Sequence, residues 1–253
     1  EANYMLIQKI GLDPAPWSFV YANTMIGTLG NPDFASAFVA LSTPATMYMV
    51  YLNIKDKKKV ATFLTLLLTQ ITALLVSKVY QGPMALTIAG LITCALLVWF
   101  TKTSLPYRLV VLSSVVLSGI VATLGVLGQG PLSSIFAKQS FQLRIHAYWE
   151  TATQMGLRHL LFGVGPDQFA DQFHRFYSLE NRRVFGPIVT DNAHNYFLQF
   201  FAEIGVIGAL FFLLLSLTTF FRALKDFSHA STNELAIKLA VIATLTVYFA
   251  QAL

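Results

Sequence analysis

Polar side chains of a reactive kind stand directly before a long apolar run in TDNAHNYFLQFFAEIGVIG, residues 190–208. His194 follows Asp191 and Asn192 and precedes Asn195. An imidazole can accept a proton at neutral pH, and the positive end of a helix dipole disfavours its charged form. We therefore interpret His194 as a general base at a helix start that Asp191 or Asn192 caps. A purely structural hydrogen bond at that start is the alternative interpretation.

A second candidate is Arg144, in the stretch QSFQLRIHAYWETATQMGLRHLLF at residues 139–162. Apolar residues recur there at helical spacing, which predicts an amphipathic helix that GVGP at residues 163–166 ends. Tyr148 and Trp149 lie about one turn from Arg144. A guanidinium fork suits phosphate oxygens. The alternative is an interfacial arginine whose stem packs beside aromatic rings.

Two further charged residues lie near the ends of apolar segments. Glu203 lies about two turns beyond His194, and a carboxylate inside a span is costly enough to indicate function. Its structural alternative is a bond to an arginine or to a helix backbone. Gly205 and Gly208 follow it and favour the close approach of another helix. Lys78, in the turn SKVYQG, faces a phosphate or anchors its helix at the lipid headgroups.

The composition is that of a membrane protein. The 253 residues are 55% hydrophobic and 11% charged, against about 25% charged in soluble domains. The net charge of +5 does not indicate nucleic acid binding, because the positions of Lys and Arg in such a chain set its orientation in the membrane. Cys94 is the only cysteine, and no two histidines stand at HxH or HxxxH spacing. We expect no disulfide, no metal site and no cofactor.

Six segments are long and apolar enough to span a bilayer, which needs about 20 residues. They predict an all-α, polytopic helical bundle, and Asn31-Pro32 is a start signal for the first of them. The predicted spans cover residues 33–52, 60–77, 83–100, 107–127, 195–221 and 234–253.

Basic residues in the connections predict the orientation. Lysine and arginine occur at residues 55–59, 102–108 and 222–225, which the positive-inside rule assigns to the cytoplasm. The N-terminal segment, the turn at residues 78–82 and the long loop then face outside. We expect one membrane domain, a fragment of a longer protein, in three regions. These are residues 1–127 with four spans, an outer loop at 128–193, and residues 194–253 with two spans.

Four groups of residues, taken in order, resemble the O-antigen ligase and O-antigen polymerase family of bacterial envelope glycosyltransferases. The first is IQKIGLDP with GTLGNPDFA, and the second is the outer turn that ends in Gln81 and Gly82. The third runs from Arg144 through Trp149 to FGVGPDQF, and the fourth is HNYFLQFFAEIGVIG. Arginine is common in the family where Gln81 stands, and Trp149 lies one position farther from Arg144 than the family spacing.

The resemblance implies a donor glycan linked to undecaprenyl diphosphate and an acceptor hydroxyl on lipid A core, on another lipid-linked repeat or on protein. Transfer takes place at the outer side of the plasma membrane, without a metal, and we hypothesise one inverting step. Arg144 would hold the diphosphate, His194 would act as base, and Asn195 would orient the acceptor. Ligase and polymerase activity both remain open. We expect further contacts to the diphosphate or glycan from Lys78, Gln81, Arg158, Arg182, Arg183 and Glu203.

Two other classes of protein are the alternatives. A transporter or channel predicts charged residues at mid-bilayer and broken helices, whereas the predicted spans are almost free of charge in their middles. Glu203, near an outer end, is the main exception. A non-catalytic scaffold with a partner-binding outer loop predicts that Arg144 and His194 tolerate substitution.

Overall fold

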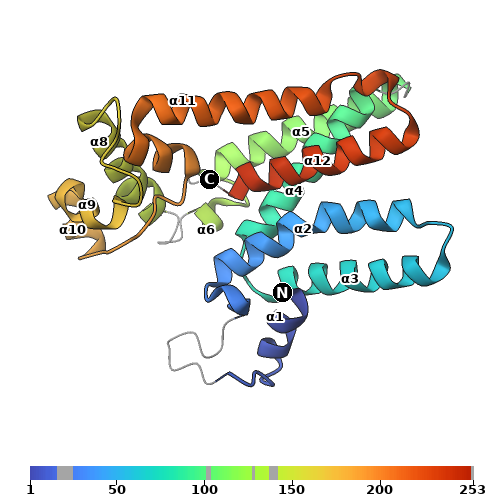
Figure 1. Ribbon diagram of the computed structural model, residues 1–253, viewed down its shortest axis with the longest axis horizontal. Coiled ribbons are helices and arrows are strands. Elements are labelled where there is room, and N and C mark those ends of the chain that lie inside the picture. The colour runs from blue at the N-terminus through green and yellow to red at the C-terminus, as the bar shows by residue number, and fades with distance from the viewer. Residues whose placement is uncertain (16–24, 101–103, 127–128, 137–141, 252–253) are drawn as a thin grey trace. The chain divides into compact units, whose positions relative to one another are not determined.

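The computed structural model describes residues 1–15, 25–100, 104–126, 129–136 and 142–251. These described residues form helices, turns and loops and contain no β-strand, which confirms the predicted all-α class. Figure 1 shows the helices in chain order. The chain divides into two compact units, one of Glu1–Leu112 with Arg222–Gln251 and one of Ser113–Phe221.

The six predicted spans are confirmed, with boundaries that differ by a few residues. Each corresponds to a helix long and apolar enough to cross a membrane. These helices are α2 (Pro32–Leu52), α3 (Lys57–Val76), α4 (Gln81–Phe100), α5 (Leu105–Val126), α11 (Tyr196–Leu224) and α12 (Thr232–Gln251).

Helix starts in the first unit follow local signals in the sequence. The side chain of Asn31 accepts a hydrogen bond from the backbone N–H of Asp33 at 2.8 Å, and Pro32 occupies the first helical position of α2. Asp56 caps α3 in the same way, because its carboxylate accepts from the backbone N–H of Lys58 and Lys59. These bonds satisfy donors that have no partner within the helix.

Small side chains hold the helices of the first unit close together. Helix α2 packs against α3, α4 and α12 (Figure 1). The buried contacts include Ala35 and Ala40 on α2 and Ala85 and Ala89 on α4. A Cβ added at Gly82 would lie 2.3 Å from Ser36 Oγ, so α4 approaches α2 at a glycine. Such small residues let helix backbones pack closely in a membrane.

A hydrogen-bond network links IQKIGLDP to GTLGNPDFA, the two parts of the first group of family-like residues. It lies near α1 (Ala2–Lys9) and the short helix η1 (Gly27–Leu29). Gln8 donates to Asp13 Oδ2 at 2.9 Å and accepts from the backbone N–H of Gly27 at 2.8 Å. The Tyr4 hydroxyl donates to Asp13 Oδ1 at 2.8 Å. IQKIGLDP and GTLGNPDFA therefore form one local structure.

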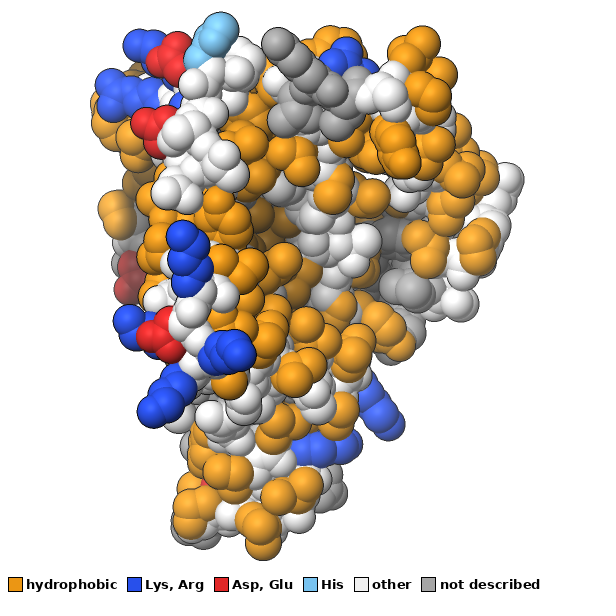
Figure 2. Space-filling model, turned by 90° about the vertical axis from the view of Figure 1, so that its right-hand side faces the viewer, with side chains coloured by type: hydrophobic (Ala, Val, Ile, Leu, Met, Phe, Trp, Pro, Cys, Tyr) orange, Lys and Arg blue, Asp and Glu red, His pale blue; other side chains and the backbone are white. Residues whose placement is uncertain are grey.

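Large apolar side chains remain exposed along the spans. Leu68 and Leu75 on α3 are 64% and 70% exposed, and Phe211 on α11 is 71% exposed. Figure 2 shows one face of the molecule on which hydrophobic side chains predominate, with Lys and Arg side chains interspersed. A surface of this kind suits contact with lipid rather than with water.

The second unit contains the loop that sequence predicted to be amphipathic and helical. A π-helix, η2 (Arg144–Trp149), runs directly into α8 (Glu150–Arg158). This confirms the helix, although residues 139–141 lie outside the described part of the chain. Shorter helices precede and follow, namely α6 (Ser133–Phe136), α9 (Phe169–Phe176) and α10 (Leu179–Phe185). The core of the unit includes Ala147, Ala152, Met155, Phe169, Phe173, Ala193 and Ala202.

The predicted end of the amphipathic helix is wrong. Helix α8 ends at Arg158, with His159 outside helical geometry, so it stops before GVGP. The physical reason is that the Leu160 carbonyl accepts a hydrogen bond from the backbone N–H of Val206 at 2.8 Å. The chain from Leu160 onward is thus engaged with α11 and is not free to continue the helix.

Candidate functional site

Helix α11 is broken at Gly205, whose φ of 70° and ψ of −171° are not helical. A break of this kind releases backbone groups that must find other partners. The segment before α9 supplies them. The bonds run from Val164 N to Ala202 O (2.8 Å), from Gly165 N to Glu203 O (2.9 Å) and from Val206 N to Leu160 O (2.8 Å).

Two glycines make this contact possible. A Cβ added at Gly163 would lie 2.3 Å from the carbonyl carbon of Glu203, and one added at Gly205 would lie 2.3 Å from the Leu161 oxygen. Both glycines also have positive φ values, 66° and 70°. The third and fourth sequence motifs therefore meet backbone to backbone, and no larger residue fits at either position.

Gly205 and Gly208 were predicted to contact another helix, and this prediction is wrong. Gly205 approaches the backbone of Leu161 and Phe162, which belong to a loop and not to a helix. The three atoms nearest to a Cβ at Gly208 all belong to the side chain of Ile204, on the same helix. The loop lies against α11 because the break at Gly205 leaves hydrogen-bonding groups that a regular helix would not offer.

The Glu203 carboxylate holds the start of α9. It accepts hydrogen bonds from the backbone N–H groups of Asp167 and Phe169 and from the side chain of Gln199. Gln199 in turn accepts from the backbone N–H of Ala193 through Oε1 at 2.7 Å. A chain of hydrogen bonds thus connects the GVGPD loop to the residue directly before His194.

His194 lies in a left-handed backbone conformation, with a φ of 51°. Its own N–H donates to Asn192 Oδ1 at 3.0 Å. A non-glycine residue in this region costs on the order of 1–3 kcal/mol, and such strain persists only where surrounding contacts fix the backbone. Two hydrogen bonds fix the backbone here. The N–H of Ala193 donates to Gln199, and the N–H of His194 donates to Asn192.

The residue that caps α11 is Asn195, so the predicted capping by Asp191 or Asn192 is wrong. Asn195 Oδ1 accepts from the backbone N–H of Leu198 at 3.1 Å, and the residue is 9% exposed. The helix cannot begin earlier because the positive φ of His194 interrupts helical geometry just before Asn195.

Tyr148 brings His194 and Arg144 together. The rings of Tyr148 and His194 stack with their centroids 5.4 Å apart and their planes at 25°. Burial raises the pKa of the Tyr148 phenol above its usual range, while the charge of Arg144 lowers this pKa. The phenol is therefore neutral at physiological pH. Within the second unit an imidazole therefore stacks on this ring, and a cation lies close enough to affect its phenol.

The π-helix accounts for the unusual spacing between Arg144 and Trp149. Hydrogen bonds in a π-helix run between residues five apart, instead of four apart as in an α-helix. Arg144 and Trp149, five residues apart, therefore lie one helical turn apart on the same face of η2. The additional residue relative to the family spacing is accommodated inside η2, and α8 continues regularly after it.

The predicted loop arginines lie in different environments. Arg158 is exposed and lines a pocket of about 720 Å³. Arg182 donates to the carbonyl of His174 and lies over the Tyr177 ring, 5.6 Å from its centroid. Arg183 is exposed on α10. None of these three arginines forms an ion pair within the described part of the chain.

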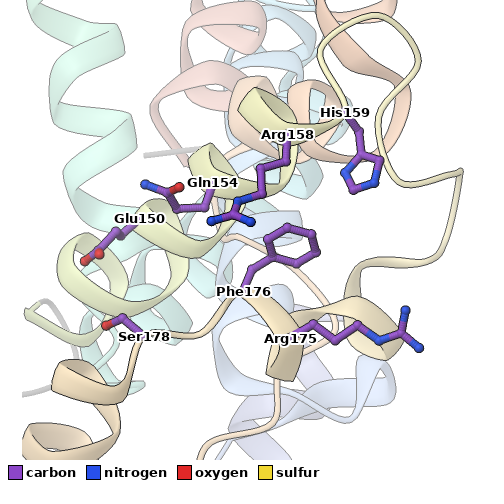
Figure 3. Close-up of a pocket in the computed structure, with 7 residues that line it drawn as sticks. All are labelled: Glu150, Gln154, Arg158, His159, Arg175, Phe176 and Ser178. Atoms are coloured by element: carbon purple, nitrogen blue, oxygen red, sulfur yellow. The ribbon is translucent and has the colours of Figure 1, made fainter.

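The pocket lies between α8 and α9 (Figure 3). Glu150, Gln154 and Arg158 line it from α8, and Arg175 and Phe176 line it from α9. Figure 3 shows Arg158 turned toward Gln154 and Phe176, whereas the guanidinium of Arg175 points away from them. Polar, cationic and aromatic groups therefore share one concave surface.

Two predicted binding residues belong to the first unit. Lys78 is exposed in the connection between α3 and α4, with a φ of 59°. Gln81 donates to the carbonyl of Gln251 at 2.6 Å, and the side chain of Gln251 donates to the carbonyl of Ala37 at 2.9 Å. Gln81 thus joins α4 to α12, and through Gln251 to α2.

Sequence reasoning named Tyr148 and Gln199 without giving either a place in the site. The signal for Gln199 is its spacing, because Asn195, Gln199 and Glu203 are four residues apart along an otherwise apolar helix. Such residues share one helix face. The contact of Tyr148 with His194 has no local signal, since the two residues are far apart in sequence.

Fold and site define a multi-pass helical membrane protein in which a histidine stacks on a partly buried tyrosine ring and an arginine acts electrostatically on the same tyrosine. A family model described as O-antigen ligase matches residues 63–213, more than half of the chain. The chain therefore belongs to the O-antigen ligase family, whose members are membrane enzymes that transfer glycans. No curated protein sequence matches it.

Proposed function

We propose that this protein transfers a glycan from an undecaprenyl diphosphate carrier to a hydroxyl of a lipid- or glycan-linked acceptor. The reaction takes place at the outer face of the bacterial plasma membrane, with residues 128–193 outside. The observation that carries the proposal is the arrangement of Arg144 and His194 around Tyr148. It combines a cation suited to phosphate with a base suited to a hydroxyl.

The proposed chemistry is a single displacement at the anomeric carbon of the donor sugar. The acceptor oxygen forms the new C–O bond while the bond between the sugar and the diphosphate oxygen breaks. The acceptor proton passes to the imidazole of His194, and the undecaprenyl diphosphate leaves with the electron pair. One displacement inverts the configuration at the anomeric carbon.

Arg144 stabilises the leaving diphosphate, whose negative charge increases in the transition state. A guanidinium presents two parallel donors to phosphate oxygens, and a group that acts on developing charge lowers the barrier directly. The proposed step assigns this role to the protein's own guanidinium and includes no metal ion.

His194 acts as the general base, and its neighbours position it. Tyr148 fixes the plane of the imidazole, while Asn192 and Gln199 fix the backbone on either side. Asn195 retains its proposed role in orienting the acceptor, through the amide nitrogen that its capping bond leaves unused. Glu203 acts through Gln199 as a positioning residue.

The remaining predicted residues contribute to binding in the proposal. Lys78 supplies charge at the outer turn, and Gln81 holds the helix that follows this turn. Arg158, Arg182 and Arg183 add positive charge to the outer loop. The lysine and the three arginines raise the local concentration of an anionic lipid without touching the reacting atoms.

The substitution of Arg144 by alanine and by lysine tests the proposal. Alanine is expected to reduce glycan transfer by about 100- to 1,000-fold, and lysine to restore part of it, because a point charge replaces the fork. Transfer is measured in proteoliposomes with lipid-linked glycan, with the amount of inserted protein determined in parallel. Full transfer by a stably inserted Arg144→Ala protein contradicts the assignment.

A further inference from the structure

The pocket between α8 and α9 has a composition that the transfer step itself does not require. Its volume of about 720 Å³ is in the range of sites for small ligands. Gln154 and Ser178 offer neutral hydrogen-bonding groups, and Phe176 offers an aromatic ring. Side chains of these kinds bind sugars, because a sugar combines hydroxyl groups with apolar C–H faces.

The pocket extends along one face of α8. Glu150, Gln154 and Arg158 are spaced four residues apart, so they form a row about 12 Å long at a rise of 1.5 Å per residue. The opposite face of the helix is buried through Thr151, Ala152 and Met155. The row therefore faces outward along its whole length and suits an extended chain of sugars.

The charges in the pocket favour an anionic ligand. The two arginines outnumber the one carboxylate, that of Glu150, which accepts a hydrogen bond from the side chain of Asn181 at 2.9 Å. Arg175 donates to Gln172 at 3.2 Å, while Arg158 has no hydrogen-bond or ion-pair partner in the described part of the chain. Figure 3 shows the guanidinium of Arg158 turned toward Phe176. An unpaired guanidinium beside a ring matches a sugar that carries a negative charge.

We propose that this pocket binds an anionic sugar residue of the glycan, with the Arg158 guanidinium on its carboxylate. The inference rests on the proposed function and specifies the class of glycan that the outer loop recognises. The diphosphate of the carrier is bound elsewhere, by Arg144, so the pocket selects the glycan and does not take part in bond breaking.

The test uses the full chain, purified in detergent, and saturation-transfer difference NMR with three probes. Methyl glucuronide represents an anionic sugar, methyl glucoside a neutral sugar, and inorganic pyrophosphate a diphosphate without sugar. We expect the glucuronide to bind more tightly than the glucoside and to resist displacement by an equal concentration of pyrophosphate. The inference is overturned if the two sugars bind equally well, or if an equal concentration of pyrophosphate displaces the bound glucuronide.

Two substitutions locate the binding. Arg158→Gln is expected to weaken glucuronide binding about tenfold, as one charge-assisted contact is lost. Arg158→Lys should restore part of this affinity. Arg222→Gln, an exposed arginine at the end of α11, is the charge-matched control and should leave binding unchanged. Unaltered glucuronide binding by Arg158→Gln contradicts the assignment to this pocket.

The inference and the proposed function fail in different ways. His194→Ala is expected to abolish transfer and to keep glucuronide binding. If wild-type protein does not bind glucuronide but His194→Ala abolishes transfer, only the pocket assignment is overturned. If His194→Ala transfers normally while Arg158→Gln loses glucuronide binding, the proposed chemistry fails and a glycan-binding pocket remains.

Discussion

Tyr148 and His194 stack with ring centroids 5.4 Å apart, and this contact joins the π-helix η2 to the beginning of α11. Tyr148 also forms an edge-to-face contact with Phe173, with ring centroids 6.1 Å apart. Because Phe173 belongs to the core of the second unit, this contact fixes the Tyr148 ring. The imidazole thereby gains a defined orientation on a backbone that is itself held by hydrogen bonds. A rigidly supported base of this kind suits proton transfer from a hydroxyl.

Substitutions of Tyr148 separate its ring from its hydroxyl. Tyr148→Phe is expected to retain transfer, whereas Tyr148→Ala should slow it about two- to tenfold, the range that corresponds to the loss of one aromatic contact. Initial transfer rates in proteoliposomes measure the difference. If the phenylalanine variant is as slow as the alanine variant, the hydroxyl contributes to the reaction and the stacking account is incorrect.

Alanine at Gly205 or Gly163 should destabilise the protein. Each new Cβ meets backbone atoms at 2.3 Å, and each residue would also be forced into a positive φ. The expected cost is more than about 2 kcal/mol, seen as a lower midpoint of thermal unfolding in detergent. Gly90→Ala is the control, because its Cβ has no neighbour within 4 Å. Unchanged midpoints for Gly205→Ala would disprove the close contact of loop and helix.

Gln199→Leu removes both hydrogen bonds of the side chain at similar volume. We expect kcat to fall about tenfold with KM almost unchanged, because the bonds position His194 and do not contact substrate. The thermal unfolding midpoint of this variant serves as the measure of an intact fold. A raised KM with normal kcat would instead assign Gln199 to substrate binding.

The spans were predictable because each is a long apolar segment, and Asn31 with Pro32 gave the start of α2 directly. The break in α11 was not predictable from hydropathy, since Gly205 lies in a continuous apolar run. The hydrogen bonds that satisfy this break come from residues 160–165, which are distant in sequence. Capping by Asn195 was missed for a similar reason, because it depends on the backbone angle of His194.

The contacts of the predicted site residues favour a functional role for some of them and a structural role for others. Arg144 and His194 share a neighbour in Tyr148, which follows from the fold and from no local pattern. Glu203 indicated function because a carboxylate in an apolar helix is costly, yet its hydrogen bonds to Asp167 and Phe169 offset that cost structurally. Sequence alone cannot distinguish these two uses of a carboxylate in an apolar helix.

The most direct test of the central claim is His194→Ala, introduced into the gene of this protein and expressed in a strain that lacks the gene. Surface glycan is read on a gel, and the membrane abundance of the protein is measured alongside. The account predicts a stably inserted variant without long-chain surface glycan. Retained lipid-linked polymer then indicates a ligase, and single repeats indicate a polymerase. Unchanged surface glycan would contradict the account, because His194 would then be only a structural residue.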